Sequence, residues 1–300
     1  MRFIDRYFYK PTLLHICLAF ALLPISLMYF IIATLRRKCG RNYSFDIPII
    51  SIGNLIAGGS GKTPFLCEIA KDFHNVAIIS RGYKRTSKDL LIVSIKGTIQ
   101  ATQEQSGDEA YLIALTLKNA TVIVSKDRIA GILEAKKLGA KIIFLDDGFR
   151  FNFGQLNIVL SPKLEPFFRF TIPSGIYREN PFAMGDLNLK EGIDYDRKVT
   201  IKNPTQRMLL LTAIANPARL DEFLPKNIIG KILLKDHARF DFTHLSDEFK
   251  KHNATSLLVT KKDFVKLDKC ALPLSILELK ININDNIKKH INNFVKSYKR

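Results

Sequence analysis

A glycine-rich segment between a strand-like run and a helix-like run is the feature that most constrains the fold of this chain. The apolar run Ile49–Ile52 is followed by Gly-Asn-Leu-Ile-Ala-Gly-Gly-Ser-Gly-Lys-Thr-Pro at residues 53–64. Glycines leave backbone N–H groups free to surround phosphate oxygens, Lys62 adds a cation, and the Thr63 hydroxyl is a suitable Mg²⁺ ligand. The usual spacing requires glycine at position 56, where this chain has Ile56. An ordinary glycine-rich turn is the competing interpretation, but the strand–loop–helix context favours a loop that binds a nucleoside triphosphate.

A second acidic segment supports this interpretation from a distance. The run Lys141–Leu145 leads into Asp146, Asp147 and Gly148. Such a run is typical of a buried parallel strand, and ligands of open α/β sheets lie at the carboxyl ends of the strands. Asp-Asp-Gly after a strand is by itself more often a turn. Together with the glycine-rich loop, it predicts that Asp146 holds Mg²⁺, directly or through water, opposite Thr63.

The N-terminus is the most apolar part of the chain. Residues 11–34 contain no Asp, Glu, Lys or Arg and are followed by Leu-Arg-Arg-Lys at 35–38. About 20 apolar residues of helix are enough to cross a bilayer, so this segment predicts a membrane helix. A cleaved signal peptide and a buried core helix are the alternatives. Pro24 is compatible with a kinked, shallow insertion, and basic residues at both ends leave the orientation open. The nucleotide-binding part is expected in the cytoplasm, where triphosphates are.

The overall charge points to a polyanionic partner. The formal net charge is +18 and the pI is about 9.7. No zinc-finger spacing or RNA-binding aromatic signature accompanies it, which argues against nucleic acid. Anionic lipid is favoured, since each Lys or Arg beside a membrane contributes about 1 kcal/mol of attraction to acidic headgroups. Part of the charge is a solvated lysine-rich surface, especially at 280–300. Four cysteines without metal or redox spacing fit a reducing compartment.

Strand-like and helix-like runs alternate along the rest of the chain, which indicates βαβ units and a largely parallel sheet. Strands are expected at 49–52, 76–80, 90–95, 121–124, 141–145 and 157–160, and helices after the glycine-rich loop, at 107–117 and at 127–138. Residues 167–186 are expected to be irregular. A second α/β pattern has strands at 208–213, 229–234, 256–260 and 274–279. We therefore predict an α/β fold of the P-loop NTPase type with a mainly parallel sheet core. The expected parts are an N-terminal membrane helix (1–40), a nucleotide-binding domain (41–203) and a smaller C-terminal α/β domain (204–300).

Two short segments with acidic residues are candidates for chemistry beyond nucleotide binding. Asp108 and Glu109 open a helix-like segment, where first-turn carboxylates also interact favourably with the helix dipole. Asp236 and His237 follow a strand-like run, where such a pair is most often surface. If a histidine meets a carboxylate, it can orient that carboxylate to accept a hydroxyl proton. The spacing along the chain does not say whether Asp108 and His237 meet.

Two basic positions follow strand-like or irregular segments. Arg81 comes directly after the run 76–80, and Arg178 precedes Glu179 in Pro-Ser-Gly-Ile-Tyr-Arg-Glu at 173–179. Each is either solvated charge or part of the ligand side of the sheet. On that side a guanidinium binds phosphate and a carboxylate supports Mg²⁺.

Taken together, these motifs resemble those of the tetraacyldisaccharide 4'-kinase family. The matching segments occur in order over nearly the whole chain, at 53–64, 80–83, 107–109, 145–149, 173–179, 215–217, 236–237 and 258–263. The glycine pattern of the family also accounts for Ile56. The resemblance implies ATP-dependent phosphorylation of the 4'-hydroxyl of a tetraacyldisaccharide 1-phosphate, an anionic glycolipid, to the 1,4'-bisphosphate of lipid A biosynthesis. It implies Mg²⁺ as cofactor and a place at the cytoplasmic face of the bacterial inner membrane.

The resemblance also implies roles for individual residues. Asp108 resembles the residue that accepts or orients the substrate hydroxyl proton, with His237 as its partner and Lys62 as a catalytic cation. The nucleotide-binding segment corresponds to Ile56, Ala57, Gly58, Gly59, Ser60, Gly61, Lys62 and Thr63. The Mg²⁺ environment corresponds to Thr63, Asp146 and Glu179, and the substrate contacts to Asn54, Arg81, Asp147 and Arg178. The acid and the histidine lie in different expected domains, which suggests closure around substrate.

Some positions depart from the family pattern, and other functions compete with the kinase. Arg150 and Phe151 stand where Gln-His is common, Ala110 replaces a frequent proline, and Ala238 replaces an aromatic residue or a second histidine. A membrane-anchored NTPase that switches a partner is the main alternative, and it would need a water-orienting group instead of a hydroxyl-activating base. A basic membrane-surface protein with a vestigial nucleotide site is a third. Acyl-chain preference and oligomeric state are not predicted.

Overall fold

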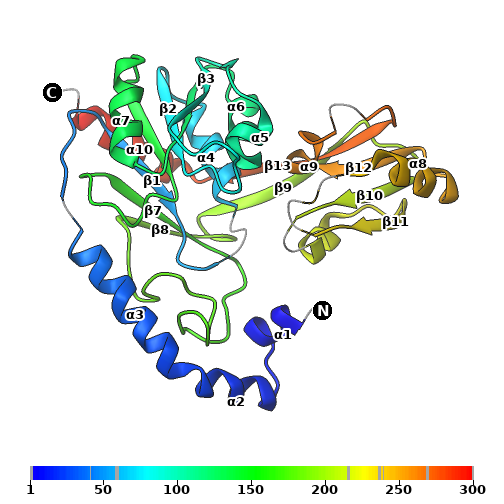
Figure 1. Cartoon of the computed structure of the whole chain (residues 1–300), viewed down its shortest axis with the longest axis horizontal. Helices are drawn as coiled ribbons and strands as arrows, with labels where there is room; N and C mark the ends of the chain where they lie inside the picture. Colours follow the sequence, from blue (N-terminus) through cyan, green and yellow to red (C-terminus); the bar gives the residue numbers. More distant parts are fainter. Residues whose placement is uncertain are drawn as a thin grey trace.

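Two β-sheets lie side by side, and the N-terminal helices run along the larger of the two parts (Figure 1). The computed structural model describes residues 3–40, 42–57, 61–214, 217–235, 238, 240–267 and 270–298. Within these residues the larger sheet has eight strands in the order β4-β3-β5-β2-β6-β1-β7-β8. They span Ile49–Gly53 (β1), Val76–Ser80 (β2), Leu91–Ile95 (β3), Thr98–Ile99 (β4), Thr121–Val124 (β5), Ile142–Asp146 (β6), Leu156–Ser161 (β7) and Leu187–Lys190 (β8).

The larger sheet is mainly parallel, as predicted. The strands β5, β2, β6, β1, β7 and β8 run parallel, whereas β3 is antiparallel to β5 and β4 to β3. Its central strands β1, β2, β5 and β6 are buried along their whole length, because helices cover both faces. The helices α4 (Lys62–Ala70), α6 (Asp108–Thr116) and α7 (Arg128–Lys137) confirm the three expected helices, and the short α5 (Gln103–Ser106) precedes α6.

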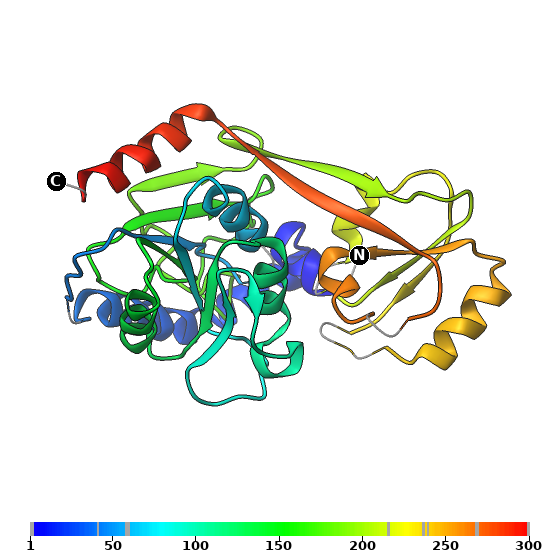
Figure 2. The same cartoon turned by 90° about the horizontal axis from the view of Figure 1, so that it is seen from above.

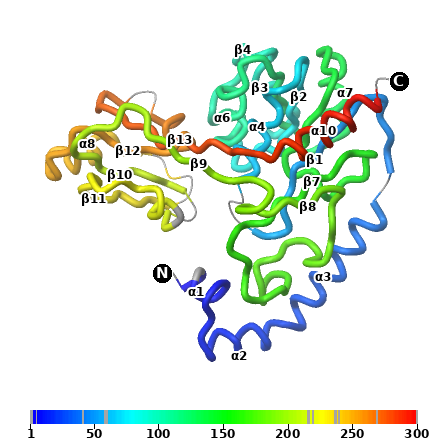
Figure 3. Tube along the Cα trace, turned by 180° about the vertical axis from the view of Figure 1, so that it is seen from behind, coloured from blue at the N-terminus to red at the C-terminus, as the bar shows by residue number. Residues whose placement is uncertain are grey.

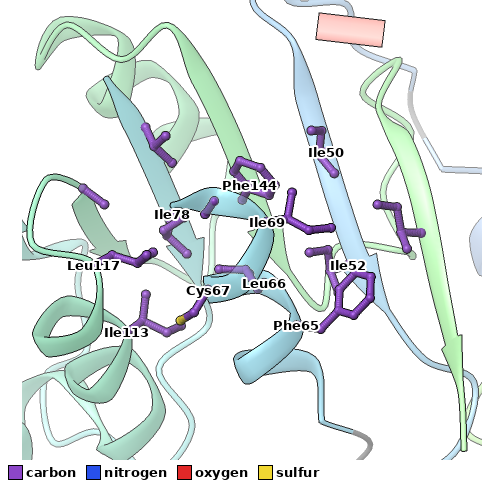
Figure 4. Close-up of a cluster of buried hydrophobic side chains, with 14 of the residues drawn as sticks. Ile50, Ile52, Phe65, Leu66, Cys67, Ile69, Ile78, Ile113, Leu117 and Phe144 are labelled. Atoms are coloured by element: carbon purple, nitrogen blue, oxygen red, sulfur yellow. The ribbon is translucent and has the colours of Figure 1, made fainter. Parts of the chain in front are cut away.

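The two faces of this sheet have separate apolar cores. On one face, α4 packs Phe65, Leu66 and Ile69 against Ile78 and Phe144 of the strands (Figure 4). On the other face, Ile132 and Ala135 of α7 pack against Ile49, Ile79 and Leu145. The core therefore holds β1 and β6 next to each other, with their carboxyl ends at one edge.

A second sheet forms the other part of the molecule. Within the described residues its order is β11-β10-β12-β13-β9, in which only β9 is antiparallel to its neighbour. The strands span Tyr195–Lys202 (β9), Met208–Thr212 (β10), Ile228–Leu233 (β11), Ser256–Thr260 (β12) and Leu274–Ile283 (β13). The helices here are α8 (Phe242–Lys251), α9 (Lys261–Phe264) and a 3₁₀ helix at Pro217–Phe223. The four predicted strands of this part are confirmed, and β9 adds a fifth.

The chain crosses between the two parts through β9 and β13. These strands run side by side across the molecule (Figure 2). After β13 the last helix, α10 (Asp285–Ser297), returns to the larger sheet, where Ile287, Ile291 and Val295 join its core (Figure 3). The division of the chain at residue 203 stays a prediction, but the C-terminal helix packs with the first part.

The N-terminal segment consists of three helices instead of one: α1 (Phe3–Tyr9), α2 (Leu13–Ala21) and α3 (Leu23–Lys38). The membrane helix expected over 11–34 is not confirmed as a single helix, because the segment forms α2 and α3 with a bend of 56° between them. Pro24 lies in the first turn of α3, where its missing N–H costs no helical hydrogen bond. Within the described residues, no individual helix is long and apolar enough to cross a bilayer, whereas the bent pair α2–α3 has the necessary length and composition.

These helices are joined to the irregular segment 162–186 by buried hydrogen bonds. The Ser26 hydroxyl of α3 donates to Thr171 O (2.7 Å) and accepts from Ser174 N (2.9 Å), while the Thr171 hydroxyl donates to Ser26 O (2.6 Å). The Tyr7 hydroxyl of α1 donates to Ser174 O (3.0 Å). We call this group the Ser26 contact. It fixes the segment that, a few residues later, enters the candidate site.

Candidate functional site

The loop after β1 lies at the carboxyl edge of the sheet, as predicted. Ala57 N donates to Ile176 O at 2.8 Å, and Ile56 is buried in a bridge with Tyr177. Gly61 has φ +76°, a conformation that glycine adopts without strain, and α4 begins at the next residue. Of the predicted nucleotide-binding residues, Gly58, Gly59 and Ser60 lie outside the described residues. Lys62 and Thr63 occupy the first turn of α4, where backbone N–H groups and the helix dipole favour an anion.

Four predicted residues meet directly at this edge. Lys62 Nζ donates to Asn54 Oδ1 at 2.8 Å and lies 3.9 Å from Asp147 Oδ1. Arg178 Nη2 donates to the same Asn54 oxygen at 2.7 Å and to Asp147 Oδ1 at 2.5 Å. Two cations and one carboxylate therefore surround one amide, and the net positive charge suits a phosphate.

Asp147 is held in place by its backbone as well as by its charges. Its φ of +60° is unusual for a non-glycine residue, and its N–H donates to Ile52 O at 2.9 Å, which ties the end of β6 to β1. Partial burial raises the pKa of Asp147, but the charges of Lys62, Arg178 and Arg150 outweigh this effect and lower it. The carboxylate is therefore kept ionised.

Asp146 has the opposite environment. It is 5 % exposed at the end of β6, and Ser80 Oγ of β2 donates to its Oδ2 at 3.0 Å. Its Oδ1 is buried and makes no hydrogen bond within the described residues. Burial, followed by the charge of Glu109, raises the pKa of Asp146 to about 6. A buried carboxylate oxygen without a partner is costly unless something binds it.

Glu179, predicted as a metal ligand, lies in an ion pair. Its Oε1 is 2.5 Å from Arg150 Nε, so the residue that departs from the family pattern neutralises this buried carboxylate. Thr63 is half-buried in the first turn of α4. In the described part of the chain, no three His, Cys, Asp or Glu side chains are grouped as a metal site. The metal site predicted from Thr63, Asp146 and Glu179 thus stays a prediction.

Asp108 lies in a second group of charges at the start of α6. Gly107 precedes it with φ +87°, which turns the chain between α5 and α6. Gln103 Nε2 donates to Asp108 Oδ1 at 2.8 Å, and Lys266 Nζ, from the second part of the molecule, lies 2.9 Å from Oδ2. Next to this pair, Lys262 Nζ is 3.9 Å from Glu109. His237, the predicted partner of Asp108, lies outside the described residues.

Two cations near these carboxylates were not predicted from the sequence. Arg128 is 4 % exposed at the start of α7, and its Nη2 donates to Asp146 O at 3.2 Å. Burial lowers the pKa of Arg128, and the like charge of Arg81 adds to this effect. Arg81 itself is exposed just after β2. The sequence signal for Arg128 was its place after Asp127, which caps α7. Lys266 had no sequence signal.

A cavity of about 580 Å³ adjoins the site on the side of α3. It is lined by Arg37 and Lys38 of α3, by Phe149, residues 151–155 and Asn157, and by Glu179. The Arg37 guanidinium lies 3.8 Å from the centre of the Phe149 ring. The end of α3 therefore contributes basic side chains to a hollow next to the Arg150–Glu179 pair.

Comparison with known proteins identifies similar chains over almost the full length. A family model described as tetraacyldisaccharide-1-P 4'-kinase matches residues 18–189. The protein named tetraacyldisaccharide 4'-kinase from Helicobacter pylori (strain J99) is 56 % identical over 298 residues, 99 % of this chain and 96 % of that one. The protein of the same name from Campylobacter jejuni (serotype O:2) is 42 % identical over 301 residues, which cover 99 % and 97 % of the two chains. The crystal structure of LpxK from Aquifex aeolicus, described as a complex with ATP, superposes with a TM-score of 0.72 and 26 % identity over 93 % of this chain and 99 % of that one.

Proposed function

The chain belongs to the tetraacyldisaccharide-1-P 4'-kinase family, and we propose on this premise that it transfers the γ-phosphoryl group of ATP to the 4'-hydroxyl of tetraacyldisaccharide 1-phosphate. The product is the 1,4'-bisphosphate of lipid A biosynthesis. The observation that carries this proposal is the group of Asn54, Lys62, Asp147 and Arg178 at the carboxyl edge of β1 and β6. It lies where the phosphates of a nucleotide bind in α/β sheets of this kind.

Within this group the cations have separable tasks. Lys62 follows the loop and is directed toward the β- and γ-phosphates, as in other phosphate-loop enzymes. Arg178 offers a planar guanidinium that recognises a phosphate or sugar oxygen once it is released from Asp147. Asn54 holds both cations through one oxygen atom. These two cations are thus preorganised before the nucleotide arrives, which lowers the cost of charge stabilisation in the transition state.

The residues present fit a Mg²⁺ ion. The unpartnered Asp146 Oδ1 is an oxygen ligand without another bond in the described structure, and Thr63 adds a hydroxyl at the start of α4. Mg²⁺ is bound by one or two carboxylates together with substrate phosphates, and it neutralises charge on the transferring group. Glu179 serves in this environment by holding Arg150 in place.

Asp108 orients and accepts the proton of the 4'-hydroxyl. As the new O–P bond forms and the bond between the β- and γ-phosphates breaks, the hydroxyl proton passes to the Asp108 carboxylate and ADP leaves. Gln103 Nε2 donates to one oxygen of that carboxylate at 2.8 Å, and Lys266 Nζ lies 2.9 Å from the other, so both oxygens are held in place. His237 is the proposed second partner of Asp108.

We further propose that the enzyme acts at the cytoplasmic face of the inner membrane. The helices α2 and α3 expose large apolar side chains that suit the boundary between headgroups and acyl chains. These are Leu13, Leu14, Leu18, Phe20, Ile25, Leu27, Met28, Ile31, Ile32 and Leu35. The basic end of α3 then meets anionic headgroups, and the cavity beside Arg37 and Lys38 suits the phosphorylated disaccharide of the substrate.

Transfer of radiolabelled γ-phosphate from ATP to tetraacyldisaccharide 1-phosphate, in detergent with Mg²⁺, tests the function. We expect labelled lipid from the intact chain, none from Lys62→Ala and a strongly reduced amount from His237→Ala. Lys71→Ala, which removes an exposed lysine paired with Glu68 at the other end of α4, is the matched control and should remain active. Release of free phosphate without labelled lipid would instead establish the membrane-anchored NTPase.

A further inference from the structure

Lys266 is a buried cation directed at the proposed base from the other part of the molecule. Its Nζ lies 2.9 Å from Asp108 Oδ2, and the two side chains are 9 % and 13 % exposed. Within the described residues this ammonium makes no aligned hydrogen bond. The contact is therefore an ion pair, and the N–H groups of Lys266 can still donate. The centre of the Phe240 ring lies 6.0 Å from Nζ. A charge shielded to this degree is stable only beside its counter-ion.

The segment that carries Lys266 is held rigidly on the second sheet. Asp263 is fully buried; its Oδ2 accepts from the hydroxyls of Thr212 and Thr260, both at 2.8 Å, and its Oδ1 from Ala213 N at 3.1 Å. Lys266 N donates to Asp263 O at 3.0 Å, and Leu267 packs in the core of this part. The backbone of Lys266 is therefore fixed relative to β10 and β12, and α9 lies next to α6 of the larger part (Figure 1).

We propose that Lys266 is a positioning residue for the phosphoryl transfer. It acts through Asp108, whose carboxylate it holds in place toward the acceptor hydroxyl through the contact between the two parts of the molecule. This inference rests on the proposed function, because it takes Asp108 as the group that receives the hydroxyl proton. Lys266 itself gives up no proton in the step. Its contact makes the alignment of the base depend on how the second sheet is placed.

The neighbouring Lys261 provides a matched comparison. It lies five residues earlier on α9 and pairs with Glu278 at 3.1 Å, and Glu278 retains Lys202 at 3.1 Å if Lys261 is removed. Both lysines thus bridge to a carboxylate that is mostly buried, but only Lys266 reaches Asp108. A general loss of stability from removing a lysine of this segment would appear in both variants.

The first test is steady-state kinetics of the full-length chain with ATP and tetraacyldisaccharide 1-phosphate. We expect Lys266→Met to lower kcat by about 10- to 100-fold, the loss typical of a misplaced catalytic group, while the KM for ATP changes by less than about threefold. Lys266→Arg should recover part of kcat, and Lys261→Met should resemble the intact chain. A wild-type kcat for Lys266→Met would overturn the proposal. If that variant does not fold, Lys266→Gln, which keeps polar donors without the charge, takes its place.

The second test is a double-mutant cycle with Asp108→Ala. If Lys266 acts through Asp108, adding Lys266→Met to Asp108→Ala should reduce kcat by less than about twofold beyond Asp108→Ala alone. Multiplication of the two separate losses would show that Lys266 acts on its own and would overturn the positioning role. An intact chain that labels no lipid would refute the proposed function, whereas an active chain with a wild-type Lys266→Met would refute only this inference.

Discussion

At the scale of single residues, the site is organised around two adjacent carboxyl groups with opposite environments. The pKa of Asp146 is raised to about 6 by burial, whereas cations lower the pKa of Asp147. Groups whose pKa values are pushed apart in this way perform different tasks. The ionised Asp147 organises Lys62 and Arg178, and Asp146 keeps an oxygen atom available for a cation.

The environment of Asp146 predicts that this residue destabilises the protein when no cation is bound. The pKa of Asp146 in the folded state is above the ordinary value of 3.8, so the folded state binds this proton more tightly than the unfolded state does. The free energy of unfolding therefore falls as the pH rises from about 4 to about 6. Asp146→Asn should therefore raise the free energy of unfolding in EDTA at pH 7.5, by an amount of the order of 3 kcal/mol. The gain should vanish near pH 4.

Urea denaturation of the full chain at both pH values measures this effect. The same variant should lose phosphoryl transfer in the presence of Mg²⁺, so that stability and activity change in opposite directions. Asp127→Asn is the control, because that exposed side chain caps α7 by accepting from Ile129 N and Ala130 N, a role that asparagine retains. Equal stability of Asp146→Asn and the intact chain at pH 7.5 would contradict the environment inferred for Asp146.

At the scale of elements, the Ser26 contact links the apolar helices to the site. The segment it holds continues to Tyr177, which bridges Ile56 of the phosphate loop, and to Arg178, whose carbonyl accepts from the Tyr29 hydroxyl at 3.2 Å. One helix therefore supports a stretch of chain that has no regular structure of its own between residues 162 and 186.

Replacing Ser26 by valine should disturb the lipid site more than the nucleotide site. The valine side chain removes the hydroxyl from a position that is 2 % exposed. It leaves the Ser174 N–H without its partner, whereas the Thr171 carbonyl still accepts from Gly175 N at 2.9 Å. Each unsatisfied buried group costs about 1–3 kcal/mol. We expect the KM for the lipid to rise at least about fivefold with little change in ATP affinity, and faster proteolysis within 162–186.

A matched variant separates this effect from the simple loss of a serine. Ser246→Ala removes a hydroxyl that donates only to Phe242 O of its own helix, α8, so it should change neither the lipid KM nor the proteolysis pattern. An equal rise in the KM for ATP and for lipid in Ser26→Val would count against a selective link to the substrate segment.

At the scale of the whole molecule, the C-terminal helix joins the two sheets into one structure. α10 follows directly on β13 of the second sheet and buries three side chains in the core of the first. A change in α10 therefore reaches both parts. This arrangement predicts that the two parts unfold together rather than as independent domains.

Ile291→Ala tests this expectation. Ile291 is fully buried in α10, and truncation of such a side chain costs about 2–5 kcal/mol. We expect one unfolding transition, shifted to lower temperature, when it is followed both by calorimetry and by far-UV circular dichroism. Lys289→Ala, on the exposed side of the same helix, should leave the transition unchanged. Two separate transitions, of which only one moves, would show that the parts are independent.

Much of the fold was predictable because its central strands are short apolar runs bounded by turn residues. β1, β2, β5 and β12 coincide with the expected segments within one residue. β9 was missed because its half-buried residues Tyr195–Lys202 include several charges, and its place depends on pairing with β13. Lys266 was missed because it meets Asp108 only through the packing of two sheets, and local sequence carries no sign of that contact. The Arg150–Glu179 pair depends likewise on two loops that lie far apart in the chain.

A truncation of residues 1–38 removes the Ser26 contact together with the apolar helices. Deleting residues 1–38 should release the protein from membranes and weaken use of the lipid more than binding of ATP, which sedimentation with vesicles and ATP titration together measure. Persistent sedimentation would show that the basic surface of the remaining chain is sufficient for membrane binding.

On the proposed placement of α3 in the lipid layer, two hydrogen-bonded serine and threonine side chains connect that layer to Arg178. On this proposal we expect the KM for the lipid to differ between detergent and vesicles, because the surroundings of α3 then bear on the segment that carries Arg178.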